Sequence, residues 1–361
     1  MKSNTVKNFS EIQNTSVFSQ FFSSKTLDLH LKHDESSNML AIIAIHSTRL
    51  GPALGGCRYR PYAKVEDAII DAIRLAQGMS FKAAISNLPF GGGKAVIIQS
   101  QEIAHRTQLF RSFGQFVHEL GGRYITAEDS GTGVEDMDII RTVTPFVTGN
   151  SGQLFTVKDP SSLTAIGVRR GIEAAVKHKL NRSELDGLQV AICGVGHVGY
   201  HLAKELHQRG VKLLVSDIKP STTEQCADEF HAIPLEPDEI YKQAVDVYSP
   251  CALSNAVSFA NIEEINAKII AGSANNQLES PELAKRLKEK GILYAPDYVI
   301  NAGGLIHVSA QYNNQTEQMA RENIENIYNT VLMIFEKAAK ENLSPLEIAD
   351  QLARQRLFAM S

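Results

Sequence analysis

The chain has 361 residues, enough for two domains of ordinary size. Hydrophobic residues make up 43% of it and charged residues 21%, a balance that excludes an intrinsically disordered protein. With 36 Lys and Arg against 40 Asp and Glu, the formal charge of -4 gives no electrostatic reason to expect nucleic acid or an anionic membrane as a partner.

The sequence also predicts no membrane span and no metal centre. No apolar run reaches the ~18 residues that a spanning helix needs, and the polar N-terminal stretch lacks the apolar centre of a signal peptide. The four cysteines, Cys57, Cys193, Cys226 and Cys251, form no CxxC pair, and no HExxH motif occurs. We therefore expect neither disulfides nor a bound metal, and a cytoplasmic location.

The first half of the chain predicts strands and amphipathic helices. After about 35 polar residues that we leave unassigned, residues 39–45 are apolar enough for a buried strand. A Gly-rich stretch covers 51–56, and a helix with acidic residues in its first turn is predicted from Val65. Further along, the apolar spacing predicts a strand at 95–98, a helix over 109–120 and a strand at 123–126.

A stretch rich in Pro, Gly, Asn and Ser at 145–163 predicts a domain boundary. Beyond it, strands are predicted at 189–193, 211–216, 245–248, 268–271 and 292–294, with a helix over 197–209. Such alternation implies right-handed crossovers and a parallel sheet. We thus predict an α/β protein of two domains. Residues 1–149 form a first α/β domain, completed by C-terminal helix at about 340–361, and 150–339 form a doubly wound Rossmann-type domain.

A dinucleotide-binding motif opens the second domain. Gly194, Gly196 and Gly199 form a GxGxxG pattern that directly follows a predicted strand and begins a predicted helix, and the next strand ends at Asp217. The Asp217 carboxylate suits the ribose hydroxyls of NAD and opposes the 2'-phosphate of NADP, although Lys219 lies close by. The predicted pyrophosphate-binding turn comprises Gly194, Val195, Gly196, His197, Val198 and Gly199.

Two lysines stand in unusual surroundings. Lys82 lies among small and apolar residues, and Lys94 follows three glycines and precedes an apolar strand, which favours burial. A P-loop is excluded because Ala95 stands where Ser or Thr would bind magnesium. A buried amine beside another cation loses proton affinity and can act as a general base. Asp129 follows a predicted strand and is either a catalytic carboxylate or an ordinary loop residue.

Residues 38 to about 350 resemble the glutamate, leucine, phenylalanine and valine dehydrogenase family, most closely its leucine dehydrogenases. The resemblance rests on GPALGG at 51–56, RLAQGMSFK at 74–82, FGGGKAVI at 90–97, GGRYITAED at 121–129, CGVGHVGYHL at 193–202, SPCAL at 249–253, AGSANNQL at 271–278 and YAPDYVINAGG at 294–304. It implies reversible conversion of an L-amino acid, NAD+ and water to a 2-oxo acid, ammonium and NADH.

The resemblance also implies residue roles. Lys94 would activate the attacking water, Lys82 would hold the substrate α-carboxylate, and Asp129 would handle the amino group and its proton. Further cofactor contacts would come from Cys251, Ala252, Asn275 and Asn301. The family's substrate-pocket positions correspond to Leu54, Gly55, Gly56, Met79, Ala127, Pro160, Thr164, Leu305 and Val308.

Most of these pocket side chains are apolar. Members that act on glutamate carry a Lys where this chain has Leu54 and a hydroxyl residue where it has Val308, so a γ-carboxylate would be left unpaired here. We therefore expect a branched-chain substrate such as leucine, valine or isoleucine. A phenylalanine- or tryptophan-preferring enzyme is the alternative, because Leu305 is bulkier than the Val common in leucine enzymes.

Two more distant alternatives belong to other classes. A non-catalytic NAD-binding sensor would have no need of Lys82, Lys94 and Asp129, and a 2-hydroxy acid dehydrogenase would need a His–carboxylate pair that the sequence does not suggest. The family also implies a homo-oligomer. The chain stops soon after Arg356, where octameric relatives continue, so both a dimer and an octamer remain open.

Overall fold

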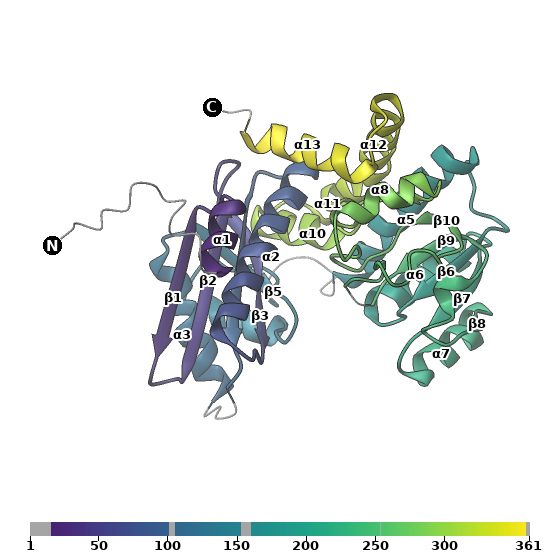
Figure 1. The fold of residues 1–361 in the computed structure, drawn as a ribbon. Coiled ribbons are helices and arrows are strands. Elements are labelled where there is room, and N and C mark those ends of the chain that lie inside the picture. Colours follow the sequence, from purple (N-terminus) through teal and green to yellow (C-terminus); the bar gives the residue numbers. More distant parts are fainter. Residues whose placement is uncertain (1–15, 101–104, 153–159, 253, 359–361) are drawn as a thin grey trace. The chain divides into compact units, whose positions relative to one another are not determined.

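The computed structural model describes residues 16–100, 105–152, 160–252 and 254–358, and these form two compact units (Figure 1). Of the described residues, the first unit holds those up to 152, together with Gln311–Asn314 and the chain from Arg356. The second unit holds those from Pro160 to Ala310 and Gln315–Gln355.

A five-stranded mixed sheet forms the centre of the first unit, in the order β1-β2-β4-β3-β5. Its strands are β1 (Asp28–Asp34), β2 (Met39–Ser47), β3 (Ala53–Arg60), β4 (Gly91–Ile98) and β5 (Tyr124–Glu128). Strand β2 is antiparallel to both β1 and β4, whereas β3 is parallel to β4 and β5. The carboxyl ends of β4 and β5 therefore lie on either side of β3, at the same edge of the sheet.

Helices cover both faces of this sheet (Figure 1). On one face, α2 (Val65–Ile85) packs Ile69 and Ile73 against Ile42 of β2, with α1 (Ser16–Ser23) alongside. On the other face, α3 (Arg106–Glu119) and α4 (Val134–Arg141) enclose a larger core. Cys57 is fully buried in that core.

Two strands of the first unit are absent from the sequence predictions. β1 has the sequence DLHLKHD and lies at the edge of the sheet, and its two leucines among polar residues gave no clear strand signal. β3 contains the Gly-rich stretch: a Cβ atom on Gly55 would lie 1.7 Å from the carbonyl oxygen of Gly93. The glycines here allow two backbones to approach closely within a sheet.

The second unit contains a six-stranded, wholly parallel sheet in the order β11-β10-β9-β6-β7-β8. Its strands are β6 (Gln189–Cys193), β7 (Lys212–Ser216), β8 (Ile233–Pro234), β9 (Val245–Pro250), β10 (Ala267–Ile270) and β11 (Leu293–Tyr294). The five predicted strands are confirmed, and β8 adds a sixth. The strand order reverses between β6 and β9, the kind of switch point at which parallel α/β sheets bind ligands.

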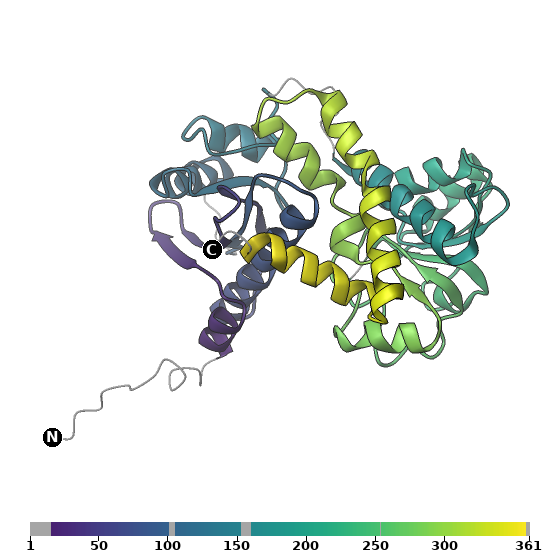
Figure 2. The same ribbon diagram turned by 90° about the horizontal axis from the view of Figure 1, so that it is seen from above.

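Helices α5 (Ser161–Leu180), α6 (His197–His207), α7 (Pro220–Phe230), α8 (Glu282–Glu289) and α9 (Asp297–Ile300) accompany this sheet, followed by α10 (Gly303–Tyr312), α11 (Glu317–Glu325), α12 (Ile327–Glu341) and α13 (Pro345–Phe358). Figure 2 shows α12 running alongside α5. Within the described ranges, no helix is both long and apolar enough to cross a membrane.

The boundary between the units differs from the predicted one. The stretch 145–163 is not a continuous linker, because Ser161 already begins α5, and 153–159 lie outside the described residues. The C-terminal segment was expected to complete the first domain from about residue 340. Residues up to Gln355 belong instead to the second unit, where the Tyr298 hydroxyl donates to Asp350 at 2.8 Å. From Arg356 the chain belongs to the first unit, and that residue donates to the carbonyl oxygen of Ala84.

Candidate functional site

A buried ion pair in the first unit joins the middle of β4 to the loop that follows β5. Lys94, in β4, has a side chain only 6% exposed, and its Nζ lies 3.1 Å from Oδ1 of Asp129, the residue that directly follows β5. The strands that carry them flank β3, so the sheet topology itself brings them together. Burial of Lys94 and the strand-end position of Asp129 were both predicted, and both are confirmed.

Arg58 is a second cation at Asp129, and the sequence analysis missed it. Its Nε donates to Oδ2 of Asp129 at 2.8 Å. Burial alone would raise the pKa of Asp129, but Lys94 and Arg58 outweigh it and lower that pKa to about 2. Asp129 is therefore ionised at neutral pH, with each oxygen facing a different cation.

Glycines of β3 make room for this pair. A Cβ atom on Gly56 would lie 2.8 Å from Cβ of Asp129 and 2.5 Å from the carbonyl oxygen of Glu128. Gly55 packs even more closely on Gly93, the residue before Lys94. A side chain at Gly55 would displace β4, which carries Lys94, and a side chain at Gly56 would displace Asp129. This steric requirement accounts for both glycines beside the ion pair.

The remaining predicted substrate residues of the first unit lie on β3, β5 and α2. Leu54 of β3 and Ala127 of β5 are buried, while Met79 and Lys82 are half-buried in the C-terminal part of α2. Helix α2 packs directly on β4, the strand that carries Lys94. A Cβ atom on Gly92 of β4 would lie only 2.0 Å from the backbone nitrogen of Ser80 in α2.

In the second unit, the four predicted substrate residues lie in two helices or directly before one of them. Pro160 precedes α5, and the Thr164 hydroxyl donates to its carbonyl oxygen at 3.0 Å. The start of α10 packs on this turn, since a Cβ atom on Gly304 would lie 3.1 Å from Oγ1 of Thr164. Leu305 and Val308 are buried in α10.

The glycine turn after β6 has the geometry that the motif predicts. Gly194 has a φ of +98°, and a Cβ atom there would lie 2.5 Å from Cβ of Ala252. A Cβ atom on Gly199 would lie 1.9 Å from the carbonyl oxygen of Gly194, so only glycine lets α6 begin so close to the turn. Gly196 and His197 are exposed at the N-terminus of α6, the end of a helix whose partial positive charge favours a phosphate. Val195 is buried and Val198 half-buried.

Asp217 lies at the end of β7, across from this turn. Its Oδ2 accepts a hydrogen bond from the Val195 backbone at 2.9 Å, and its Oδ1 accepts one from the Lys219 backbone at 3.0 Å. A carboxylate has about four acceptor positions, which leaves capacity for a ribose diol. Cys251 follows β9, the strand that pairs with β6 on the side away from β7, and its backbone N–H donates to the carbonyl oxygen of Cys193 at 2.7 Å.

Asn301 and Asn275 are in direct contact. Nδ2 of Asn301 donates to Oδ1 of Asn275 at 2.9 Å and to the carbonyl oxygen of Ser273 at 3.0 Å. Oδ1 of Asn301 is buried and has no hydrogen-bond partner within the described part of the chain. Such an acceptor costs about 1–3 kcal/mol unless a donor reaches it. A carboxamide N–H of a nicotinamide group is a donor that fits.

The described residues include no group of three or more His, Cys, Asp or Glu side chains suited to hold a metal ion. The first unit holds an aspartate that pairs with a buried lysine and with an arginine. The second unit holds a glycine turn next to an acidic strand end. A chain with these two units has the make-up of a dinucleotide-dependent dehydrogenase.

Comparison with known proteins identifies the particular family. Residues 23–145 match the Glu/Leu/Phe/Val dehydrogenase dimerisation domain, and residues 214–358 match the Glutamate/Leucine/Phenylalanine/Valine dehydrogenase domain. The chain is 46% identical to leucine dehydrogenase of Thermoactinomyces intermedius over 327 residues, which cover 91% of this chain and 89% of that protein. It is 40% identical to valine dehydrogenase of Streptomyces virginiae, over 91% and 92% of the two chains.

The crystal structure of L-tryptophan dehydrogenase from Nostoc punctiforme superposes with a TM-score of 0.82 at 41% identity, covering 94% of this chain and 98% of that one. The chain therefore belongs to the Glu/Leu/Phe/Val dehydrogenase family. It is an L-amino-acid dehydrogenase that uses a nicotinamide cofactor.

Proposed function

We propose that the enzyme catalyses the reversible NAD-dependent oxidative deamination of branched-chain L-amino acids. The balanced reaction is L-amino acid + NAD+ + H2O giving 2-oxo acid, ammonium, NADH and a proton. The observation that carries this proposal is the buried Lys94–Asp129 pair of the first unit, with Nζ and Oδ1 3.1 Å apart. The high identity to leucine dehydrogenase over nearly the whole chain supports the same substrate class.

Each residue has a proposed task. The Asp129 carboxylate, ionised at neutral pH, holds the substrate ammonium group and takes up its proton. Lys94 is the base that activates the water which attacks the imino carbon. Lys82 binds the α-carboxylate and so fixes the α-carbon in place for the reaction. The glycine turn and Asp217 would hold the nicotinamide cofactor, which would supply the hydride acceptor for this oxidation.

Apolar pocket residues support the proposed preference for an aliphatic substrate side chain. Leu54 is 1% exposed and Val308 is 9% exposed, and neither can pair a substrate γ-carboxylate. We therefore propose selection against glutamate by about 10³-fold, since each ~1.4 kcal/mol of discrimination is tenfold. Aromatic substrates are the second candidate, because the tryptophan dehydrogenase is also similar over nearly the whole chain.

A substrate panel tests this proposal. We expect NADH formation, followed at 340 nm, to give higher kcat/KM for leucine, valine and isoleucine than for phenylalanine, tryptophan and glutamate. Higher kcat/KM for phenylalanine or tryptophan would replace the branched-chain proposal with the aromatic one. Binding of NAD without turnover of any amino acid would instead support a sensor. If the reverse reaction needed no ammonium, a 2-hydroxy acid dehydrogenase would be the better description.

The preference for NAD over NADP is proposed from Asp217. We expect Asp217→Asn to raise the KM for NAD about tenfold and to narrow the preference over NADP, since the charge is lost while an acceptor remains for the Val195 N–H. Asp246→Asn is a matched control, because Asp246 likewise accepts from a backbone N–H of the same sheet, that of Gln189. Kinetics with both cofactors measure the change. A wild-type enzyme that works better with NADP contradicts the assignment.

We also propose a homo-oligomer that works in the cytoplasm. The match to a dimerisation domain over 23–145 supports self-association, and light scattering in solution measures the number of subunits. All four cysteines are free thiols, which supports a reducing compartment.

A further inference from the structure

We propose that Arg58, itself held by Asp71 and Tyr62, is a positioning residue that orients the Asp129 carboxylate for catalysis. This inference rests on the proposed deamination, in which Asp129 must present one oxygen to the substrate ammonium group. It adds to that reaction three residues to which no role has been given so far.

The two oxygens of Asp129 have different partners. Oδ1 lies 3.1 Å from Nζ of Lys94, whereas Oδ2 accepts from Nε of Arg58 at 2.8 Å. The backbone is fixed as well, because the Asp129 N–H donates to Oγ1 of Thr132 at 2.9 Å, and that hydroxyl donates to the carbonyl oxygen of Cys57 at 2.8 Å. The carboxylate cannot rotate without breaking its bond to Arg58, so Oδ1 stays directed at Lys94.

Arg58 is held from its other side. Its NH1 donates to Oδ2 of Asp71 at 2.9 Å, and the hydroxyl of Tyr62 donates to the same oxygen at 2.6 Å. A guanidinium is planar and rigid, so two carboxylates bonded at different edges fix the plane of the group. Asp71 is on α2 and Arg58 on β3, and the bond between them ties the helix to the strand.

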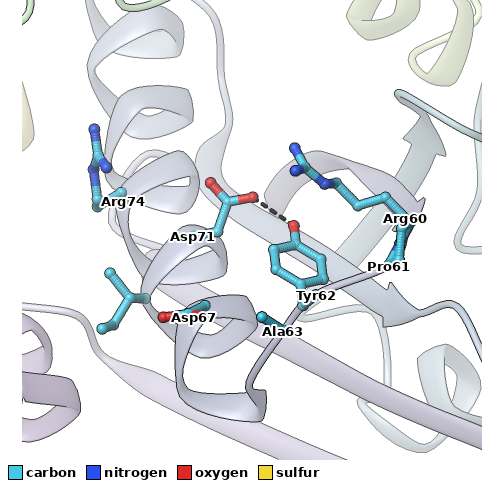
Figure 3. A pocket seen from close by; sticks show the side chains of 8 residues that line it. Arg60, Pro61, Tyr62, Ala63, Asp67, Asp71 and Arg74 are labelled. Carbon is cyan, nitrogen blue, oxygen red and sulfur yellow. Dashed lines mark hydrogen bonds between the residues drawn. The ribbon is translucent and has the colours of Figure 1, made fainter.

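The chain of contacts reaches the surface of the first unit. Tyr62 and Asp71 lie in the wall of a pocket that is also lined by Arg60, Asp67 and Arg74, and Figure 3 shows the Tyr62 hydroxyl directed at Asp71. From the buried end outwards, the charges alternate: Lys94, Asp129, Arg58, Asp71.

A merely structural role is the competing explanation. Arg58 is largely buried, with its side chain 17% exposed, so any substitution there will lower stability. The two roles differ in one respect: a positioning residue acts through Asp129, so its effect on kcat disappears when Asp129 is already changed. A structural residue costs the same in both backgrounds.

The test is a double-mutant cycle on kcat with leucine and NAD. In the wild-type background we expect Arg58→Gln to lower kcat about 30-fold while KM for leucine changes less than about threefold. In the Asp129→Asn background, the same substitution should change kcat by less than about twofold. Arg123→Gln is the control, because Arg123 pairs with Asp28 on the same sheet without contacting Asp129, and it should leave kcat unchanged in both backgrounds.

Arg58→Lys keeps the charge and is the second variant, which decides the matter if Arg58→Gln does not fold. We expect its kcat to lie within about fivefold of the wild-type value, because an ammonium group can still hold Oδ2 of Asp129. Equal losses of kcat from Arg58→Gln in both backgrounds, or a lysine variant no better than the glutamine variant, overturn the proposal. An inactive wild-type enzyme overturns the proposed function, and this inference with it; an active one with additive losses overturns only the role of Arg58.

Discussion

Lys94→Met should remove nearly all deamination activity. We expect kcat with leucine to fall by about 10³-fold, within the range that general acid–base catalysis contributes. Methionine retains most of the bulk of the side chain, so the closely packed strand β4 keeps its shape while the ammonium group is lost. Initial rates at 340 nm with saturating NAD measure the effect.

Lys32→Met is the matched control. Lys32 lies on the same sheet, in β1, and its ammonium group also pairs with a carboxylate, that of Glu119 at 2.5 Å. Its side chain is 29% exposed, however, and the residue is far in sequence from Lys94 and Asp129. We expect the control to keep wild-type kcat. NADH binding, measured by fluorescence, should persist in Lys94→Met, because the glycine turn lies in the other unit. Retention of more than about a tenth of kcat in Lys94→Met would exclude Lys94 as the base.

Asp129→Asn is the second substitution with a large expected effect. The amide keeps the shape of the side chain but can neither hold an ammonium group by charge nor take up its proton, so we expect kcat to fall by about 10²-fold or more. Rates with leucine, together with the melting temperature, separate this loss from unfolding. Activity near that of the wild type would return Asp129 to the class of ordinary loop carboxylates.

The same variant should change how stability depends on pH. The pKa of Asp129 in the folded chain is about 2, below the ~3.9 of an unfolded aspartate. The carboxylate therefore contributes stability that is fully present above about pH 4 and is lost as the pH falls towards 2. We expect denaturant unfolding to show a steeper loss of stability over this interval in the wild type than in Asp129→Asn. The same dependence of stability on pH in the wild type and in Asp129→Asn would contradict the low pKa of Asp129.

Local patterns predicted much of the fold. The strand–glycine–helix pattern at Gly194 places β6, the turn and α6 correctly, because each step depends on residues adjacent in the chain. The apolar run from Met39 likewise predicts β2. The polar edge strand β1 escaped prediction, and so did β3. The glycines of β3 are explained only by close contacts with β4 and with the end of β5, about 40 and 70 residues later in the chain.

The candidate site likewise contains residues that local sequence patterns predict and one that they do not. Lys94 and Asp129 stand out because each is a charged residue at an unusual place in a local pattern. Arg58 does not, because it is one of several arginines and its partners Asp71 and Asp129 are 13 and 71 residues away. The contacts of Arg58 can be recognised only from the arrangement of β3, β5 and α2 in space.

A crystal structure of the enzyme with NADH and 4-methyl-2-oxopentanoate tests the central claim most directly. We predict that the keto oxygen lies within hydrogen-bond distance of Nζ of Lys94, with the substrate carboxylate bound to Lys82. A substrate bound away from Lys94 and Asp129 would contradict the account.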